Sequence, residues 1–113
     1  MSDEEAVMSC GLVKTIAREQ KVALFFRSQE CGICEAVDTV KEGMGNTLKT
    51  PIITIEKEEL DDIDCKSLAD EAEIRAFPTV VLYKSGKPYH TVTFDGTENR
   101  KQIEGKLAEI DSA

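Results

Sequence analysis

Apolar residues along the chain fall into two kinds of pattern, and the first predicts strands. Short, mainly apolar runs occur at residues 22–26, 51–55 and 79–83. Such runs are typical of strands covered on both faces, as in a parallel sheet, although the pattern alone also fits a buried helix. Residues 89–94 alternate instead, with His90, Val92 and Phe94 on one face. Ser85-Gly86-Lys87 separates the last two runs and predicts a tight hairpin.

The second pattern has the spacing of helices. It predicts helices over residues 4–19, from 33 to a stop at Gly43 and Gly45, and near the C-terminus. We expect a further short helix over 65–73, and a solvated loop over 56–64, where six of nine side chains are acidic. The apolar residues that define the three longer helices are Met8, Leu12, Val13 and Ile16, then Ile33, Val37, Val40 and Met44, and finally Ile103, Leu107 and Ile110.

The order of these elements indicates the fold class. It runs helix, strand, helix, strand, short helix, strand, strand, helix, which predicts an α/β domain with one small mixed sheet and helices on both faces. A chain of 113 residues fits one hydrophobic core. We therefore expect a single domain over residues 1–113, with residues 1–5 frayed.

Charge and composition exclude several functions. The net charge of −8 argues against binding nucleic acid and disfavours an anionic membrane surface. No apolar stretch approaches the length of a transmembrane helix. The N-terminus, Met1–Glu5, is acidic where a secretory signal would be basic, so we expect a cytoplasmic location. Thiols there are mostly reduced, and a closely spaced cysteine pair indicates redox catalysis or metal binding.

The pair Cys31 and Cys34 carries the candidate chemistry. It follows a predicted buried strand and opens a predicted helix, and this context favours the redox interpretation of a CxxC motif. The free amides and positive dipole end of the first turn favour thiolate over thiol. Cys31, which precedes the helix body, is expected to be more exposed and to attack a substrate disulfide. Cys34 would then resolve the mixed disulfide.

Together with the later segment Ile74–Lys87, which contains Phe77-Pro78-Thr79 and the hairpin, Cys31-Gly32-Ile33-Cys34 resembles the thioredoxin family from about residue 20 onward. The resemblance implies a four-stranded sheet in the order 52–55, 22–26, 79–84, 89–94, and the family's short first strand is not evident. It also implies a cis bond before Pro78, and disulfide substrates that pair with the backbone at Phe77 as an added strand. Gly96 would flank the same groove, and Ile33 lies between the cysteines. No cofactor is implied, because the dithiol itself carries electrons, and a reductase of the thioredoxin-reductase type would regenerate it.

Three departures from the family pattern matter. Glu30 stands where members commonly have Trp, and Gly32-Ile33 replaces Gly-Pro. The family's buried acid, which helps to move the proton of the second thiol, falls near Phe25. Because Glu30 and Glu35 bracket the dithiol, we expect a higher pKa for Cys31 and a slower, more reducing, specialised protein.

Two other functions stay open at this point. The first is an interaction module or adaptor of the same fold with little turnover. The second is a zinc-stabilised module, since Cys10 and Cys65 bring the thiols to four, although structural zinc sites usually show two close pairs. We expect Cys10 to lie in a helix and Cys65 to start the short helix. The sequence assigns neither a role, and each is an ordinary residue or an accessory redox thiol.

Overall fold

The computed structural model describes residues 9–113. The helix start expected at residue 4, the fraying of residues 1–5 and the helix position of Met8 lie outside this range. In chain order the elements are α1 (Cys10–Glu19), β1 (Val22–Arg27), α2 (Gly32–Met44), β2 (Ile52–Glu56), the 3-10 helix η2 (Lys57–Asp61), α3 (Ile63–Glu71), β3 (Thr79–Lys84), β4 (Lys87–Thr93) and α4 (Arg100–Ser112).

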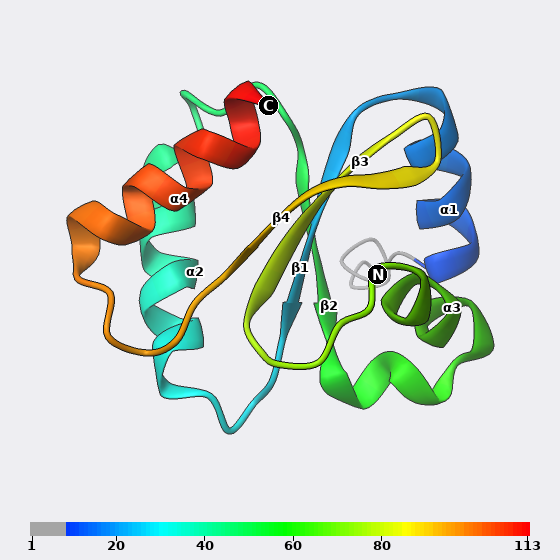
Figure 1. The fold of residues 1–113 in the computed structure, drawn as a ribbon, viewed down its shortest axis with the longest axis horizontal. Coiled ribbons are helices and arrows are strands. Elements are labelled where there is room, and N and C mark those ends of the chain that lie inside the picture. Colours follow the sequence, from blue (N-terminus) through cyan, green and yellow to red (C-terminus); the bar gives the residue numbers. More distant parts are fainter. Residues whose placement is uncertain (1–8) are drawn as a thin grey trace, which may run out of the picture.

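The four strands form one mixed sheet in the order β2-β1-β3-β4, as expected (Figure 1). β1 runs parallel to β2 and antiparallel to β3, and β4 is antiparallel to β3. Within residues 9–113 no fifth strand joins this sheet. The central strands β1 and β3 carry the continuous apolar runs because both of their faces are covered.

Two hydrophobic cores lie on opposite faces of the sheet. α1 and α3 cover one face, and α2 and α4 cover the other (Figure 1). Alternate residues of β1 enter the two cores, so that Leu24 and Phe26 pack toward α1 and α3, whereas Phe25 packs toward α2 and α4. As expected from their spacing, Val37 and Val40 of α2 are buried. The buried face of α4 is also the expected one, with Ile103, Leu107 and Ile110.

The hairpin between β3 and β4 closes with two residues, Ser85 and Gly86. Both have positive φ, 54° and 78°, as a type I′ turn requires. The turn is tied to α1, because the Gly86 amide donates to the Ala17 carbonyl at 2.8 Å. A Cβ at Gly86 would lie only 3.0 Å from Cγ of Arg18, so this position favours glycine through both backbone and packing.

Three expectations about the elements were wrong in detail. Residues 57–61 form η2 rather than a loop, because Glu56 and Glu59 form a reciprocal capping box around its start. α1 buries Cys10, Val13 and Ala17, whereas Leu12 is half-exposed. β2 lies at one edge of the sheet as expected, but it is not covered on both faces, and only Ile55 in it is fully buried.

Candidate functional site

The dithiol lies where β1 ends and α2 begins. Cys31 is the N-cap residue of α2, and Cys34 is the third residue of the helix. The Cys34 amide donates to the Cys31 carbonyl at 3.2 Å, which closes the first turn. The two sulfur atoms form a disulfide, with the Cα atoms 5.3 Å apart. No side chain caps the start of α2, so the amides of its first turn remain directed at the dithiol.

Exposure distinguishes the two sulfurs. Cys31 is partly exposed, whereas Cys34 is fully buried, as expected from their positions relative to the helix body. Only the outer cysteine can therefore be reached by a large substrate. Ile33, between them, is half-buried and packs against the core shared with α4.

The sheet register brings the Phe77–Pro78 segment to the same end of the strands as the dithiol loop. Thr79, the first residue of β3, pairs with Phe26 near the end of β1, so Pro78 lies beyond the pairing at this end. The Phe77–Pro78 peptide bond is cis. Pro78 is buried and Phe77 is half-buried, with Nζ of Lys57 6.0 Å from the centre of its ring.

Gly96 follows β4 at this same end of the strands. The Phe94 amide donates to the Pro78 carbonyl at 3.2 Å, which joins the two segments. Gly96 is exposed with φ of 95°, and a Cβ there would meet no atom within 4 Å. Glu98 holds this turn by accepting the amides of Asp95 and Gly96 at 3.0 and 3.1 Å. Burial acts to raise the pKa of Glu98, but the hydrogen bond from Lys106 and these amides lower it overall.

A network of three charged residues connects α2 to the ends of β1 and β2. Arg27, the last residue of β1, contacts Asp38 of α2 at 3.1 Å and Glu56 of β2 at 2.9 Å. The hydrogen bond with Glu56 is the main cause that raises the pKa of Arg27; burial opposes it, and the charges of Asp38, Glu56 and Glu35 add to it. The guanidinium thus stays charged and ties α2 to the ends of two strands.

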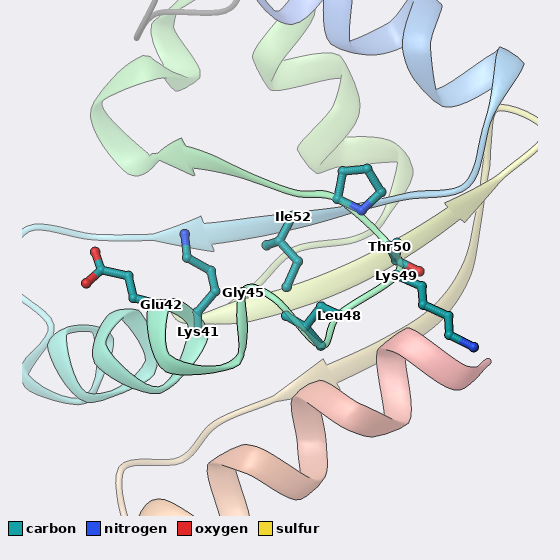
Figure 2. A pocket seen from close by; sticks show the side chains of 8 residues that line it. Lys41, Glu42, Gly45, Leu48, Lys49, Thr50 and Ile52 are labelled. Carbon is teal, nitrogen blue, oxygen red and sulfur yellow. The ribbon is translucent and has the colours of Figure 1, made fainter.

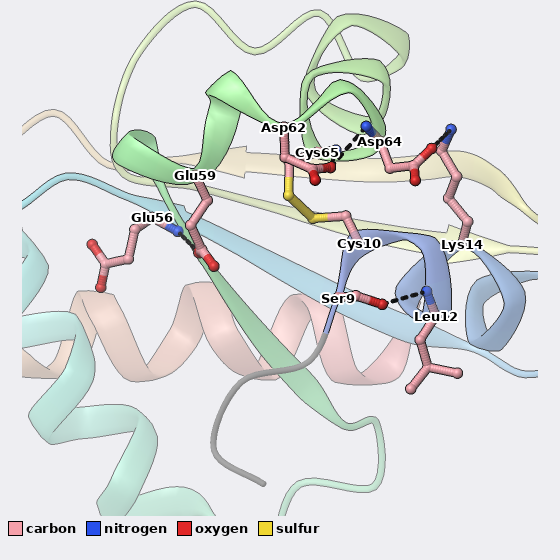
Figure 3. Close-up of a disulfide and its surroundings, with 9 residues drawn as sticks. All are labelled: Ser9, Cys10, Leu12, Lys14, Glu56, Glu59, Asp62, Asp64 and Cys65. Atoms are coloured by element: carbon pink, nitrogen blue, oxygen red, sulfur yellow. Dashed lines mark hydrogen bonds and ion pairs between the residues drawn. A yellow bond between two sulfur atoms is a disulfide. The ribbon is translucent and has the colours of Figure 1, made fainter. Parts of the chain in front are cut away.

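Cys10 and Cys65 form a second disulfide on the other face of the sheet (Figure 3). Their Cα atoms are 5.1 Å apart, and both residues are buried in the core that contains α1 and α3. Asp62 caps α3 by accepting the amides of Asp64 and Cys65. The sequence assigned no role to either cysteine, and the structure shows that they link α1 and α3 covalently.

The four cysteines therefore form two separate pairs. Among residues 9–113, no group of three or more potential ligands has a geometry that could hold a metal ion. A hollow of about 380 Å³ lies at the far end of α2 from the dithiol, between Lys41 and Ile52 (Figure 2). The lining of this hollow contains no cysteine, and none of its residues belongs to the dithiol loop, the Phe77–Pro78 segment or the Gly96 turn.

Sequence reasoning missed the charged network and the second disulfide. Arg27, Asp38 and Glu56 come from three elements, and no local spacing links them. Cys10 and Cys65 are 55 residues apart, so the even number of cysteines was the one signal for their pairing.

The sequence model of the thioredoxin family matches residues 10–109. Among curated proteins, the thioredoxin-like protein slr0233 of Synechocystis is 27% identical over 82 residues, which cover 73% of each chain. Protein disulfide-isomerase A4 of Mus musculus is 26% identical over 95 residues, covering 84% of this chain and 14% of the isomerase. The chain thus spans about one seventh of the length of that isomerase.

Solved structures show the same fold at low sequence identity. The oxidised thioredoxin from Plasmodium falciparum is 20% identical, with a TM-score of 0.71 over 93% of this chain and 95% of that one. Thioredoxin from Aeropyrum pernix is 17% identical, with a TM-score of 0.70 over 91% and 84% of the two chains. A chain in the complex of ferredoxin:thioredoxin reductase with thioredoxin f2 is 24% identical, with a TM-score of 0.61 over 89% and 84%. The thioredoxin-like fold expected from the sequence is confirmed.

Within residues 9–113, no helix has both the length and the apolar character needed to cross a membrane.

Proposed function

This chain belongs to the thioredoxin family, and we propose that it catalyses thiol–disulfide exchange through Cys31 and Cys34. One observation carries the proposal: a partly exposed cysteine at a helix N-cap is paired with a fully buried cysteine in the same turn. Catalysis by a dithiol needs this asymmetry, because one thiol must meet the substrate and the other must meet only the first.

In the reducing direction the reaction has two steps. The Cys31 thiolate attacks one sulfur of the substrate disulfide and releases the other as a thiolate, which leaves a mixed disulfide. Cys34 then attacks the sulfur of Cys31, releases the second substrate thiol and leaves the Cys31–Cys34 disulfide. The two electrons come from the dithiol, so the proposal requires no cofactor.

The substrate would bind at the end of the sheet where the dithiol lies. We assign substrate contacts to Ile33, Phe77, Pro78 and Gly96. This assignment is supported by position, because the dithiol loop, the Phe77–Pro78 segment and the Gly96 turn all lie at the same end of the strands. The exposed turn at Gly96, where a Cβ would meet nothing, leaves room for an extended segment.

The proposed partners are proteins or small molecules with disulfides, and a reductase that regenerates the dithiol. A related fold occurs in a complex of ferredoxin:thioredoxin reductase with thioredoxin f2, which supports a partner of that general type. Nucleic acids and membranes are not among the proposed partners, since the chain carries a net charge of −8.

The cytoplasm is the proposed location. In that reducing compartment the Cys10–Cys65 disulfide would have to resist reduction. Disulfides are rare in cytosolic proteins, so the Cys10–Cys65 bond would have to persist there by virtue of its burial. Rapid acid quenching of cells, followed by thiol alkylation and mass analysis, tests this. A Cys10–Cys65 pair that is reduced in cells but oxidised in the purified protein would contradict the proposed stability of this bond.

A thioredoxin-fold adaptor with little turnover is the second candidate. The observation that favours it is Phe25, which is fully buried where the family's acid would lie. Replacing both Cys31 and Cys34 with Ser separates the two functions. An adaptor keeps its partner binding and cellular function in this variant, whereas an oxidoreductase loses its function.

An equilibrium redox titration of the purified protein tests the catalytic proposal. The protein is equilibrated with defined ratios of reduced and oxidised dithiothreitol, alkylated, and mapped by mass to each cysteine. We expect one two-electron transition shared by Cys31 and Cys34, at a reducing potential. The Cys31→Ser variant should lose this transition and keep that of Cys10–Cys65. A Cys31–Cys34 pair that forms no reversible disulfide would refute the proposal.

A further inference from the structure

The proton of Cys34 has no acceptor at the place that the family resemblance implies. The family's buried acid, which helps to move this proton, would fall near Phe25. Phe25 is fully buried in the core with α2 and α4, and its ring accepts no proton. Cys34 is fully buried as well, and it must lose its proton before or while it attacks the mixed disulfide. A proton acceptor other than residue 25 is therefore needed.

Asp38 has the position that this task requires. It lies one helical turn after Cys34 on α2, and residues four apart on a helix have Cβ atoms about 5 to 6 Å apart. Side chains on a helix generally lean toward its N-terminus, which for position 38 is the turn that contains Cys34, and the Asp38 carboxylate contacts Arg27 at 3.1 Å. An oxygen placed there can reach the thiol directly or through one water molecule.

Arg27 and Glu56 fix the position of this carboxylate. Arg27 lies on the same face of β1 as Phe25, two residues further on, and its guanidinium binds Asp38 on one side and Glu56 on the other. Nε of Arg27 and Oε1 of Glu56 are buried and have no hydrogen-bond partner within residues 9–113. Buried polar atoms without a protein partner are rare, and a catalytic role is one of the reasons for which they occur.

The cluster of Arg27, Asp38 and Glu56 is negatively charged as a whole. One guanidinium is divided between two carboxylates, so the three residues together carry one negative charge. Two other charged residues of α2 lie close by. Glu35 is exposed and within the electrostatic range of Arg27, and Lys41 directs Nζ toward Thr54 Oγ1 at 3.2 Å.

We propose that Asp38 accepts the proton of Cys34 when the mixed disulfide is resolved, and that Arg27 and Glu56 are positioning residues for it. The S–H bond of Cys34 breaks and the proton passes to Asp38. The sulfur of Cys34 forms a bond to the sulfur of Cys31, whose bond to the substrate sulfur breaks, and the substrate leaves as a thiolate that takes up a proton from Asp38 or water. This inference rests on the proposed thiol–disulfide exchange.

The test measures the resolution step by itself. Reduced protein is mixed with an excess of 5,5′-dithiobis(2-nitrobenzoic acid), which releases one coloured thiolate when Cys31 attacks and a second when Cys34 attacks. The second release is intramolecular, so its rate does not depend on the reagent concentration. We compare the wild type with Asp38→Asn, which keeps the size of the side chain and removes its ability to accept a proton.

Removing a proton acceptor should lower the rate of the second release, whereas removing a nearby negative charge that accepts no proton should leave it unchanged or raise it. If Asp38 accepts the proton, Asp38→Asn slows the second release roughly tenfold or more near pH 6.5, and the deficit shrinks as hydroxide replaces it at higher pH. Asp38→Glu restores part of the rate. The matched control Glu35→Gln removes the same charge from the start of α2, and it should leave the rate unchanged or increase it, because the thiolate becomes easier to form.

Two results would overturn the inference. If Asp38→Asn accelerates the second release as Glu35→Gln does, Asp38 is only a nearby negative charge. If Arg27→Lys and Glu56→Gln both leave the pH profile of the second release unchanged, neither residue positions the acceptor. A wild-type protein that releases no second thiolate from the Cys31–Cys34 pair at any pH would instead refute thiol–disulfide exchange itself, which distinguishes failure of the proposed function from failure of this inference.

Discussion

Opposing electrostatic effects act on Cys31. The free amides at the start of α2 stabilise a thiolate at the N-cap. Glu30 and Glu35 carry negative charges on either side of the dithiol and destabilise the thiolate, and both are exposed. Because both glutamates are exposed, water and salt screen their effect on the thiolate. The reactivity of Cys31 should therefore respond to charge changes at these two glutamates.

The double variant Glu30→Gln/Glu35→Gln tests this balance. We expect it to lower the pKa of Cys31 by roughly half a unit to one unit at low ionic strength, since two like charges near the sulfur are removed. The pH dependence of the alkylation rate of the reduced protein by iodoacetamide gives this pKa. Glu42→Gln, on the same helix but three turns from Cys31, serves as the control and should change nothing. A pKa that is unchanged or raised in the double variant would contradict the argument.

At the scale of elements, the Cys10–Cys65 disulfide adds a covalent link to the packing of α1 and α3 in one core. α1 has ten residues and α3 has nine, and both are too short to be stable alone. Besides the disulfide, Lys14 and Asp64 form an ion pair at 3.3 Å that is half-exposed and contributes little (Figure 3). The covalent link, which closes a loop between residues 55 apart, should therefore contribute more to stability than this ion pair.

Cys10→Ser/Cys65→Ser should lower the free energy of unfolding by roughly 2 to 4 kcal/mol, because the unfolded chain regains the entropy of the open loop. Urea unfolding followed by circular dichroism measures the loss. Cys31→Ser/Cys34→Ser is the matched control, since its disulfide closes a loop between residues only three apart and should have a much smaller effect. Equal losses in the two variants would show that loop closure is not the cause.

Elements with local signals were predicted from the sequence, whereas contacts between distant elements were not. The apolar run in β1, the CxxC motif at the start of α2 and the Ser85-Gly86 turn each depend on a few neighbouring residues. The Cys10–Cys65 bond exists only because α1 and α3 cover the same face of the sheet. The rotation of α1 that buries Cys10 rather than Leu12 follows from this bond and from the packing of Val13.

The same division applies to the candidate site. Cys31 and Cys34 were found by their spacing, and the cysteine expected to be exposed is the exposed one. The contacts of Arg27 with Asp38 and Glu56 depend on the β1–β2 register and on the position of α2 above the sheet. No periodicity in the sequence contains that information, because each of the three residues is an ordinary charged side chain in its own element.

At the scale of the whole molecule, α4 follows the last strand and packs beside α2 on one face of the sheet (Figure 1). Asp111 near the end of α4 accepts the amides of Lys49 and Thr50 at 2.8 and 2.7 Å, in the connection between α2 and β2. Lys21, which precedes β1, donates to the Asp111 carbonyl at 3.2 Å. One carboxylate thus joins the end of the chain to the connection that leads into the sheet.

The pH dependence of stability should report this contact. Burial acts to raise the pKa of Asp111, but the hydrogen bonds from Thr50 and Lys49 and the charge of Lys21 lower it below its ordinary value of 3.8. Because the folded pKa lies below the unfolded one, the stabilisation is fully present above about pH 4 and is lost as the pH falls through the folded pKa. Asp111→Asn keeps an oxygen for both amides and removes the charge, so it should lower the free energy of unfolding at pH 7 by less than about 1 kcal/mol, since the carboxylate is partly exposed. Urea unfolding of both proteins at pH 7 and at pH 2.5 should show this difference disappear in acid. A difference that persists unchanged at pH 2.5 would mean that the substitution perturbs the packing of α4 and that the charge of Asp111 has no part in stability.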